Sequence, residues 1–323
     1  DEAHCISEWG HDFRPEYRNI RPIINKIGEA PIIALTATAT PKVQNDIQKN
    51  LGILEATVFK SSFNRPNLYY EVRTKTDDID KEIIKYIKSQ KGKSGIIYCL
   101  SRKEVEDLAE KLKVNGISAL PYHAGMDSTV RSENQDNFLL EEVEVIVATI
   151  AFGMGIDKPN IRWVVHYNMP QSIENYYQEI GRAGRDGVKS DTLLFYSLGD
   201  LVMLSKFAID SGQQQINLEK LNRMQQYAES DICRRRILLN YFGETMDHDC
   251  GNCDVCRNPP ERFDGTIIVQ KALSAIMRAD QQIGTRMLIA ILRGNYFEEL
   301  TEKGYDKMKT FGAGRDIPAR DWQ

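Results

Sequence analysis

The chain has 323 residues, enough for two or three domains that each have a core of their own. Its formal net charge of −4 argues against a protein whose whole surface binds nucleic acid, but it leaves room for a local basic groove. The hydrophobic share of 41% is typical of a globular protein, no segment approaches the length of an apolar membrane span, and the acidic, polar first residues predict no secretory signal.

The first four residues, Asp1-Glu2-Ala3-His4, place two adjacent carboxylates beside a histidine. This combination suits metal and water chemistry on a nucleotide: Asp1 would hold Mg²⁺, Glu2 would polarise the attacking water, and His4 would link the site to its neighbours. Taken alone, such a tetrapeptide is more often a helix start or an acidic surface turn. Its interpretation therefore depends on the rest of the chain.

Two apolar runs in the first part of the chain predict short strands, at residues 31–35 and 58–63. Between them, Thr40 and Pro41 are typical of a helix start, and the helix should end before Gly52. The Asn and Pro residues of 62–67 predict a link between domains.

A second α/β unit follows, in which apolar strands alternate with amphipathic helices. This alternation predicts a parallel sheet that is covered by helices on both faces. Strands are expected at residues 95–99, 119–122, 143–148, 163–167 and 193–196, and helices at 80–90, 102–114, 129–140 and 172–180.

From about residue 199 the pattern is helical only, through residue 242. Pro259-Pro260 then mark a boundary, and further helices are expected at 266–279 and 285–293.

The six cysteines are too few for a disulfide scaffold. We interpret two isolated ones, Cys5 and Cys99, as buried structural thiols. The others form a cluster that can bind a metal through four thiolates: Cys233, Cys250, Cys253 and Cys256. Such a cluster suits a tetrahedral zinc site that is coupled to folding, with an iron–sulfur cluster as the alternative. Arg234-Arg235-Arg236, next to the first ligand, could contact DNA phosphates or simply solvate a helix face.

The sharpest catalytic pattern lies at residues 178–187, which read QEIGRAGRDG. Arg182 and Arg185, three positions apart among glycines, can reach a common anion, and planar guanidinium groups suit the charge of a transferring γ-phosphate. A solvated glycine-rich turn is the alternative. Upstream, Thr149 and the glycine loop at 153–155 could hold a nucleic-acid phosphate, and Asp157 could reach ATP across a cleft. A purely structural turn explains that stretch equally well.

The order and spacing of these stretches resemble motifs II to VI of superfamily 2 helicases. The matching residues are 1–4, 36–38, 98–102, 122–126, 149–159 and 178–185. Residues 7–15, SEWGHDFRP, resemble more narrowly the aromatic-rich loop of the RecQ DNA helicases, and the helical segment that leads into the cysteine cluster resembles the same family. Glu8 stands where bacterial members commonly have Gln, which is a minor departure.

The resemblance implies roles for single residues. Trp9, Phe13 and Arg14 would sense single-stranded DNA and pass that state to the ATP site, since an aromatic ring stacks on any base and an arginine adds charge. Core packing is the alternative for the two aromatic residues. Thr36 and Thr38, at the nucleotide site, would couple hydrolysis to DNA binding, and Asp157 is also expected at the nucleotide. Gln178, Arg182 and Arg185 would form motif VI, with the arginines directed at the γ-phosphate. Arg102 and Thr149 are expected at DNA.

The implied fold is α/β: a RecA-like parallel-sheet lobe with part of a second lobe, then a helical zinc-binding domain with four cysteine ligands and a partial winged helix. The expected domains are 1–63, the end of lobe one; 64–199, lobe two; 200–258, the helical hairpin and zinc domain; and 259–323, a partial winged helix. With this resemblance, structural zinc is favoured over iron–sulfur.

The implied activity is ATP-driven, Mg²⁺-dependent translocation on single-stranded DNA, with 3′-to-5′ unwinding of duplex or branched DNA in repair and recombination. It would take place at the bacterial nucleoid or in a eukaryotic nucleus.

No P-loop is present, because Gly92-Lys93-Ser94 lacks the earlier glycine (residue 87 is Ile) and precedes a strand. We therefore expect this polypeptide alone to bind ATP poorly. A non-catalytic DNA-binding or regulatory piece is the competing hypothesis. A translocase that acts on RNA is a third one, which the aromatic-rich segment and the cysteine spacing disfavour.

Overall fold

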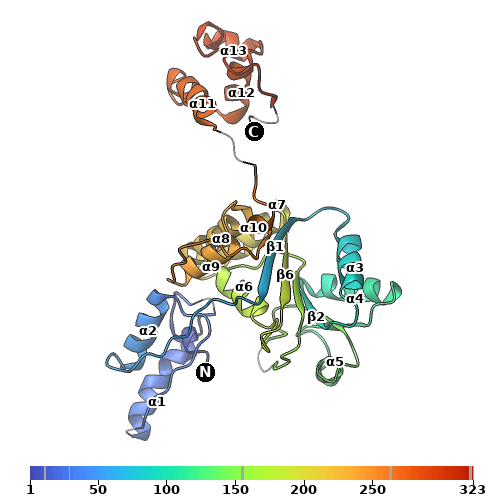
Figure 1. Cartoon of the computed structure of the whole chain (residues 1–323). Helices are drawn as coiled ribbons and strands as arrows, with labels where there is room; N and C mark the ends of the chain where they lie inside the picture. Colours follow the sequence, from blue (N-terminus) through green and yellow to red (C-terminus); the bar gives the residue numbers. More distant parts are fainter. Residues whose placement is uncertain (11, 29, 154–155, 262–263, 320–321, 323) are drawn as a thin grey trace. The chain divides into compact units, whose positions relative to one another are not determined.

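The computed structural model describes residues 1–10, 12–28, 30–153, 156–261, 264–319 and 322. The chain divides into two compact units, Asp1–Pro259 and Pro260–Gln323 (Figure 1). His11 of the aromatic-rich stretch and Met154 and Gly155 of the glycine loop lie outside the described residues.

The first 63 residues form short helices around a small apolar core. The elements are the 3-10 helices η1 (Ala3–Ile6) and η2 (Pro15–Asn19), and the α-helices α1 (Ile20–Ile27) and α2 (Pro41–Leu51). As predicted, α2 begins after Thr40 and ends at Gly52, whose φ of 66° only glycine adopts readily. One face of α2 packs against η1 through Val43 and Ile47, so α2 holds the first residues of the chain in place.

The two strands predicted in this region are wrong. Residues 31–35 and 58–63 are described in full, and neither segment is a strand. Ile33 is 80% exposed and Phe59 is 92% exposed, so the apolar runs are not buried. A strand needs a neighbour to accept and donate its backbone hydrogen bonds. Here the carbonyl of Leu35 accepts one such bond, from the amide of Ala3 at 2.8 Å, and no sheet builds on it within the described residues.

A six-stranded parallel sheet forms the centre of the first unit, in the order β1-β6-β5-β2-β4-β3. The strands are β1 (Leu68–Thr74), β2 (Gly95–Tyr98), β3 (Ala119–Tyr122), β4 (Val145–Ala148), β5 (Trp163–His166) and β6 (Ser190–Tyr196). The sequence predicted all of them except β1, which pairs with β6 along its whole length. The parallel sheet of the predicted fold class is thereby confirmed.

Helices cover both faces of this sheet because successive strand residues point to opposite sides. In β2, Ile97 packs in the cluster with α3 (Ile79–Ser89) and α4 (Arg102–Val114). Its neighbour Ile96 packs on the other face, in the cluster that includes residues of α5 (Ser128–Leu139) and α6 (Ile173–Ile180). Figure 1 shows α3 and α4 on one side of the strands and α6 on the other.

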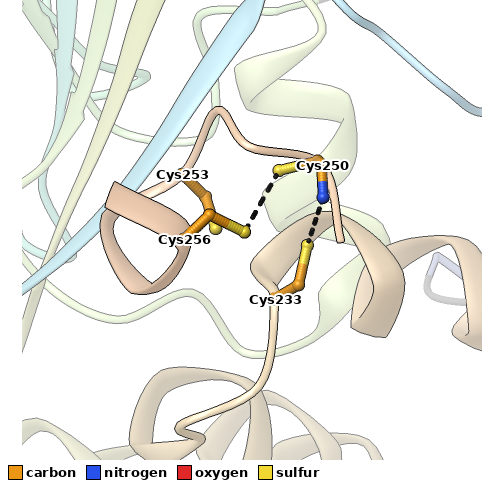
Figure 2. Close-up of side chains that lie close together, drawn as sticks. All are labelled: Cys233, Cys250, Cys253 and Cys256. Atoms are coloured by element: carbon orange, nitrogen blue, oxygen red, sulfur yellow. Dashed lines mark hydrogen bonds between the residues drawn. The ribbon is translucent and has the colours of Figure 1, made fainter. Parts of the chain in front are cut away.

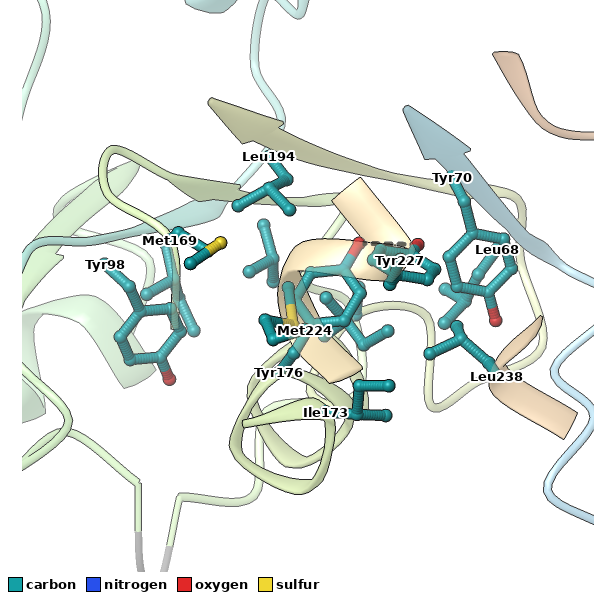
Figure 3. Packing of buried hydrophobic residues seen from close by; sticks show 14 of the residues in the cluster. Leu68, Tyr70, Tyr98, Met169, Ile173, Tyr176, Leu194, Met224, Tyr227 and Leu238 are labelled. Carbon is teal, nitrogen blue, oxygen red and sulfur yellow. Dashed lines mark hydrogen bonds between the residues drawn. The ribbon is translucent and has the colours of Figure 1, made fainter. Parts of the chain in front are cut away.

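The helical region that follows shares a core with the sheet. It contains α7 (Leu198–Ile209), α8 (Gln214–Glu229), α9 (Arg234–Tyr241) and the short α10 (Asp254–Arg257). Met224 and Tyr227 of α8 and Leu238 of α9 lie in the same buried cluster as Tyr176 of α6 and Tyr70 of β1 (Figure 3). The helical region that carries the four clustered cysteines is therefore packed onto the sheet and is not a separate module.

The second unit has its own small core. Its helices are α11 (Thr266–Arg278), α12 (Thr285–Arg293), α13 (Glu298–Glu302) and the 3-10 helix η3 (Tyr305–Lys307). Ala275, Ile291, Leu292 and Leu300 are fully buried among them. The predicted α11 and α12 are confirmed, whereas α13 and η3 were missed. Within the described ranges, no helix is long and apolar enough to cross a membrane.

Candidate functional site

The first four residues form a compact polar corner. The amide of Glu2 donates to Asp1 Oδ1 at 2.9 Å, and Glu2 has a φ of 51°, a left-handed conformation that is rare outside glycine and often found at functional sites. His4 is buried, and its Nδ1 lies 2.9 Å from Thr36 Oγ1 and 3.3 Å from Glu2 Oε2. Burial lowers the pKa of His4 to about 4, so the imidazole is neutral at pH 7. His4 thus joins the acidic residues to the segment that carries Thr36.

The aromatic-rich segment (residues 7–15) lies beside this corner. Trp9 is 38% exposed, so core packing is the wrong interpretation for this ring. The ammonium of Lys42, on α2, lies over the Trp9 ring, 2.9 Å from its centroid. Phe13 is half-buried, with the guanidinium of Arg18 5.1 Å from its centroid. Arg14 forms an exposed ion pair with Asp12, with 2.5 Å between Nη2 and Oδ2.

The segment also touches the helical region. Lys220 of α8 donates from Nζ to the carbonyl of Gly10 at 2.6 Å. Burial lowers the pKa of this lysine, because its charge has little water around it. Nothing in the local sequence around Lys220 indicates this contact, which joins positions 210 apart.

Residues 181–187, here called the arginine loop, follow α6. At the end of α6, Gln178 donates from Nε2 to Thr38 Oγ1 at 3.2 Å. Arg182 donates from Nη1 to the carbonyl of Gly153. Arg185 donates from Nη1 to the carbonyl of Ile156 at 3.1 Å and to Asp157 Oδ1 at 3.2 Å. Both arginines therefore lie against the loop that follows β4, and Asp157 is the acidic partner of Arg185.

Arg102 and Thr149 lie at the carboxyl ends of neighbouring strands. Arg102 is the first residue of α4, just after β2, and it is exposed. Its guanidinium lies over Gly125, where a Cβ would come within 2.7 Å of Nη1. Thr149 directly follows β4 and donates its amide to the carbonyl of Tyr122, at the end of β3, at 3.2 Å. This is the edge at which open parallel sheets bind ligands.

A buried polar pair behind the arginine loop was missed by the sequence reasoning. His166 Nε2 in β5 lies 2.7 Å from Glu179 Oε2 in α6, and both residues are buried. Tyr98 of β2 stacks on the His166 ring and donates its hydroxyl to the carbonyl of Phe152 at 2.9 Å. The available signal was a histidine inside an apolar strand, together with the glutamate next to Gln178.

The four clustered cysteines converge on one point (Figure 2). Their sulfur atoms all lie within 4.8 Å of one another, and Cys250 Sγ and Cys256 Sγ are 3.9 Å apart. Tetrahedral zinc with Zn–S bonds of about 2.3 Å requires sulfur atoms about 3.8 Å apart, so the donor set fits. The amide of Cys250 donates to Cys233 Sγ at 3.3 Å, and the amide of Asn252 donates to Cys250 Sγ at 3.3 Å, contacts that favour thiolates. Cys5 and Cys99 are buried elsewhere, as predicted.

The structure corrects the interpretation of the arginine run. Arg234 and Arg235 are 6% and 4% exposed, so they neither solvate a helix face nor are available to DNA. Arg234 forms an ion pair with Asp254 at 3.0 Å, and Arg235 donates to the carbonyl of Leu68 at 2.7 Å. The reason is that β1 and the cysteine loop cover this side of α9. Only Arg236 reaches the surface, where it pairs with Asp249.

Three family models match successive parts of the chain. They are the helicase conserved C-terminal domain at residues 74–187, the RecQ zinc-binding model at 198–257 and the RQC domain at 259–323. The second match contains all four clustered cysteines, so the cluster is a structural zinc site.

Known proteins resemble the chain along its whole length. The ATP-dependent DNA helicase RecQ of Haemophilus influenzae is 45% identical, covering 100% of this chain and 52% of that protein. The protein of the same name from Bacillus subtilis is 42% identical, covering 97% of this chain and 53% of that protein. The chain thus spans about half the length of these relatives.

Among solved structures, Saccharomyces cerevisiae Dbp5 bound to RNA and ADP BeF3 is similar in fold. Its TM-score is 0.53, at 19% identity, over 68% of this chain and 62% of that chain. The order of the three family models, with the 42–45% identity to RecQ proteins, means that the chain belongs to the RecQ-type helicases of superfamily 2.

Proposed function

We propose that the complete protein to which this chain belongs is an ATP-dependent DNA helicase that moves 3′ to 5′ along single-stranded DNA in repair and recombination. The observation that carries the proposal is the hydrogen bond between Gln178 and Thr38. It brings the segment with the two arginines to the segment with the acidic corner, and an ATP site needs both. Polarity and the role in repair rest on the likeness to RecQ proteins, as does a location at chromosomal DNA in the bacterial cytoplasm or the eukaryotic nucleus.

At the nucleotide, the chain's own residues would divide the work. Asp1 would hold the Mg²⁺ of the nucleotide, which supplies positive charge next to the phosphates. Glu2 would orient and polarise the attacking water, and Arg182 and Arg185 would stabilise the charge of the transferring phosphoryl group. In this structure Arg185 is paired with the exposed Asp157. Because an exposed ion pair contributes at most about 1 kcal/mol, a nucleotide triphosphate can take the place of Asp157 as the partner of Arg185.

At DNA, the aromatic-rich segment would stack on bases. The exposed Trp9 ring and the half-buried Phe13 ring supply flat surfaces, and Arg14 supplies charge. Arg102 and Thr149 would bind backbone phosphates at the carboxyl edge of the sheet. His4 lies between the aromatic-rich segment and Thr36, which supports a role of this segment in passing the DNA-bound state to the ATP site.

The domain limits that we propose are 1–63, 64–199, 200–258 and 259–323. The matched regions at 74–187, 198–257 and 259–323 and the unit boundary after Pro259 support this division. In this division, lobe two carries the arginine loop, the third domain carries the zinc, and the fourth would bind duplex or branched DNA.

The proposal is tested by the full-length protein with Arg185→Ala. We expect ATP turnover stimulated by single-stranded DNA to fall at least about 100-fold, because an arginine that acts only on the transition state lowers kcat. DNA affinity should stay within about twofold of the wild type. Equal losses in turnover and DNA affinity would remove Arg185 from this role. A full-length wild-type protein without DNA-stimulated turnover or unwinding of a 3′-tailed duplex would contradict the proposed function.

The 323-residue chain by itself is a separate case. Since it contains no P-loop, we propose that it binds DNA without turning over ATP, which is the behaviour of a non-catalytic DNA-binding piece. DNA-stimulated ATP hydrolysis by the purified chain would overturn this part of the proposal.

A further inference from the structure

The segment that joins the first helices to the sheet is fixed in place by side chains on two sides. We call residues 62–68 the brace. Its central residue, Arg65, donates three hydrogen bonds to main-chain carbonyls of the arginine loop: to Gly181 at 3.2 Å, to Ala183 at 2.8 Å and to Gly184 at 3.1 Å. Gly181 is the C-cap residue of α6, and a positive charge is favourable at this end of a helix.

A second brace residue shapes the same loop. Asn67 donates from Nδ2 to the carbonyls of Gly184 at 2.8 Å and Val188 at 3.0 Å. Gly184 has a φ of 56°, and a Cβ there would come within 2.5 Å of Asn67 Nδ2. The turn between Arg182 and Arg185 is therefore in close contact with the brace.

The other side of the brace contacts the zinc-binding region, residues 200–258. Glu244 accepts hydrogen bonds from Ser62 Oγ at 2.7 Å and from the amide of Phe63 at 2.9 Å. The Phe63 ring stacks on Phe242, with centroids 4.3 Å apart and an interplanar angle of 9°. Arg235, from α9, donates to the carbonyl of Leu68 at 2.7 Å.

These contacts form one continuous chain of packed groups from the zinc-binding region through the brace to the arginine loop. The sequence predicted residues 62–67 as a link between domains. The structure shows that they are bound to lobe two and to the zinc-binding region together. Among described residues, the preceding stretch 54–61 is exposed throughout and makes no comparable set of contacts.

We propose that Arg65 is a positioning residue for Arg182 and Arg185. The zinc-binding region holds the brace in one conformation, and the brace in turn holds the backbone of the arginine loop in one conformation. The fork of a guanidinium can reach three carbonyls at once, which a lysine ammonium cannot reproduce at the same geometry. Arg65 acts through the backbone from which both arginines project, because its three hydrogen bonds to the loop all end on main-chain carbonyls.

The first test needs no catalysis and uses the 323-residue chain. Amide hydrogen exchange across residues 181–187 should be about tenfold faster in Arg65→Ala than in the wild type, because several hydrogen bonds to a charged donor are lost locally. Arg65→Lys should recover only part of the protection. Glu244→Ala should increase exchange in the same residues by a smaller factor, since it acts through the brace.

The matched control is Arg73→Ala. Arg73 lies in β1, beyond the brace, and its guanidinium pairs with Glu71 of the same strand. Exchange at 181–187 should match the wild type in this variant. Asn67→Ala provides a second, uncharged probe of the same loop in case Arg65→Ala unfolds. Wild-type exchange at 181–187 in both Arg65→Ala and Asn67→Ala would overturn the inference.

The second test rests on the proposed function and uses the full-length protein. Arg65→Ala should lower the kcat of DNA-stimulated ATP hydrolysis at least about tenfold, with the KM for ATP and the DNA affinity within about twofold of the wild type. An unchanged kcat in Arg65→Ala would overturn the positioning role. If the wild type has no turnover, the proposed function fails, and the exchange experiment alone decides whether Arg65 orders the loop.

Discussion

Gln178 and Thr38 are 140 positions apart, and their side chains meet through a hydrogen bond of 3.2 Å between Nε2 and Oγ1. Thr38 is 1% exposed and Gln178 is half-buried, so the bond is partly shielded from water. Thr36, two residues before Thr38, touches His4, which in turn touches Glu2. Gln178 lies four residues before Arg182. A series of contacts therefore runs from the acidic corner to the arginine loop.

Removal of the Thr38 hydroxyl should break the hydrogen bond that joins the segment with Thr36 and Thr38 to the end of α6. In Thr38→Val the shape is kept, but the side-chain amide of Gln178 loses its acceptor, a loss of about 1 kcal/mol. We expect DNA-stimulated ATP turnover of the full-length protein to fall about tenfold, whereas DNA affinity stays within about twofold. Steady-state turnover at saturating DNA, together with DNA titration, measures both.

Thr40→Val is the matched control for this change. Thr40 precedes α2, two residues along the same segment, and its side chain makes no capping hydrogen bond. Its turnover should remain at the wild-type level. An equal loss in both variants would indicate general damage to the segment and would contradict a specific role of the bond between Thr38 and Gln178.

Zinc should be bound at about one ion per chain, and its removal should destabilise the first unit. Because the cysteine region shares a core with β1 and α6, Cys250→Ser should lower the melting temperature of the whole unit. Metal analysis and thermal melting measure the two effects. Cys99→Ala, at a buried thiol outside the cluster, should keep its zinc. Iron with visible absorbance would contradict the zinc assignment.

The sequence predicted the elements whose residue pattern lies entirely within one short stretch of the chain. The bounds of α4 and α12 match the structure, and the cysteine spacing alone indicated the metal site. Strand β1 was missed because its residues directly follow the Asn and Pro breakers of the brace. The strands expected at 31–35 and 58–63 failed for the opposite reason: their apolar runs are genuine, but no neighbouring strand pairs with them in the described residues.

Charged side chains were predictable only where a motif identified them. Arg234 and Arg235 look like a basic patch in the sequence, yet both are buried, because their partners Asp254 and the Leu68 carbonyl come from distant positions. Arg65 carries no motif of its own, and only the fold brings the arginine loop to it. Long-range pairing of this kind depends on the packing of whole elements, which local patterns do not encode.

The ion pair between Arg234 and Asp254 should stabilise the first unit far more than the exposed ion pair between Arg236 and Asp249 does. The side chains are 7% and 17% exposed, and Asp254 also accepts the amide of Val72 in β1 at 2.9 Å. Asp254→Asn leaves a buried guanidinium without its counter-charge, which costs about 3 kcal/mol. Urea unfolding of the chain should show this loss as a lower midpoint.

The comparison variant is Asp249→Asn, which breaks the pair with Arg236. Those side chains are 59% and 40% exposed, so water screens the interaction and the urea midpoint should stay close to that of the wild type. Equal midpoints for the two variants would show that Asp254 does not act as a buried counter-ion.

Acidification should destabilise the first unit partly through His4. Burial lowers the pKa of His4 to about 4 in the folded protein, against 6.5 when the residue is exposed. Between these values the unfolded chain binds more protons, so the stability that His4 contributes is complete above pH 6.5 and is lost as the pH falls toward 4. Thermal melting of the chain from pH 7.5 to about 5 should therefore decline less steeply in His4→Gln than in the wild type. His248→Gln, at an exposed histidine, should follow the wild type. Parallel curves for His4→Gln and the wild type would mean that His4 titrates normally and that its burial does not exclude the proton.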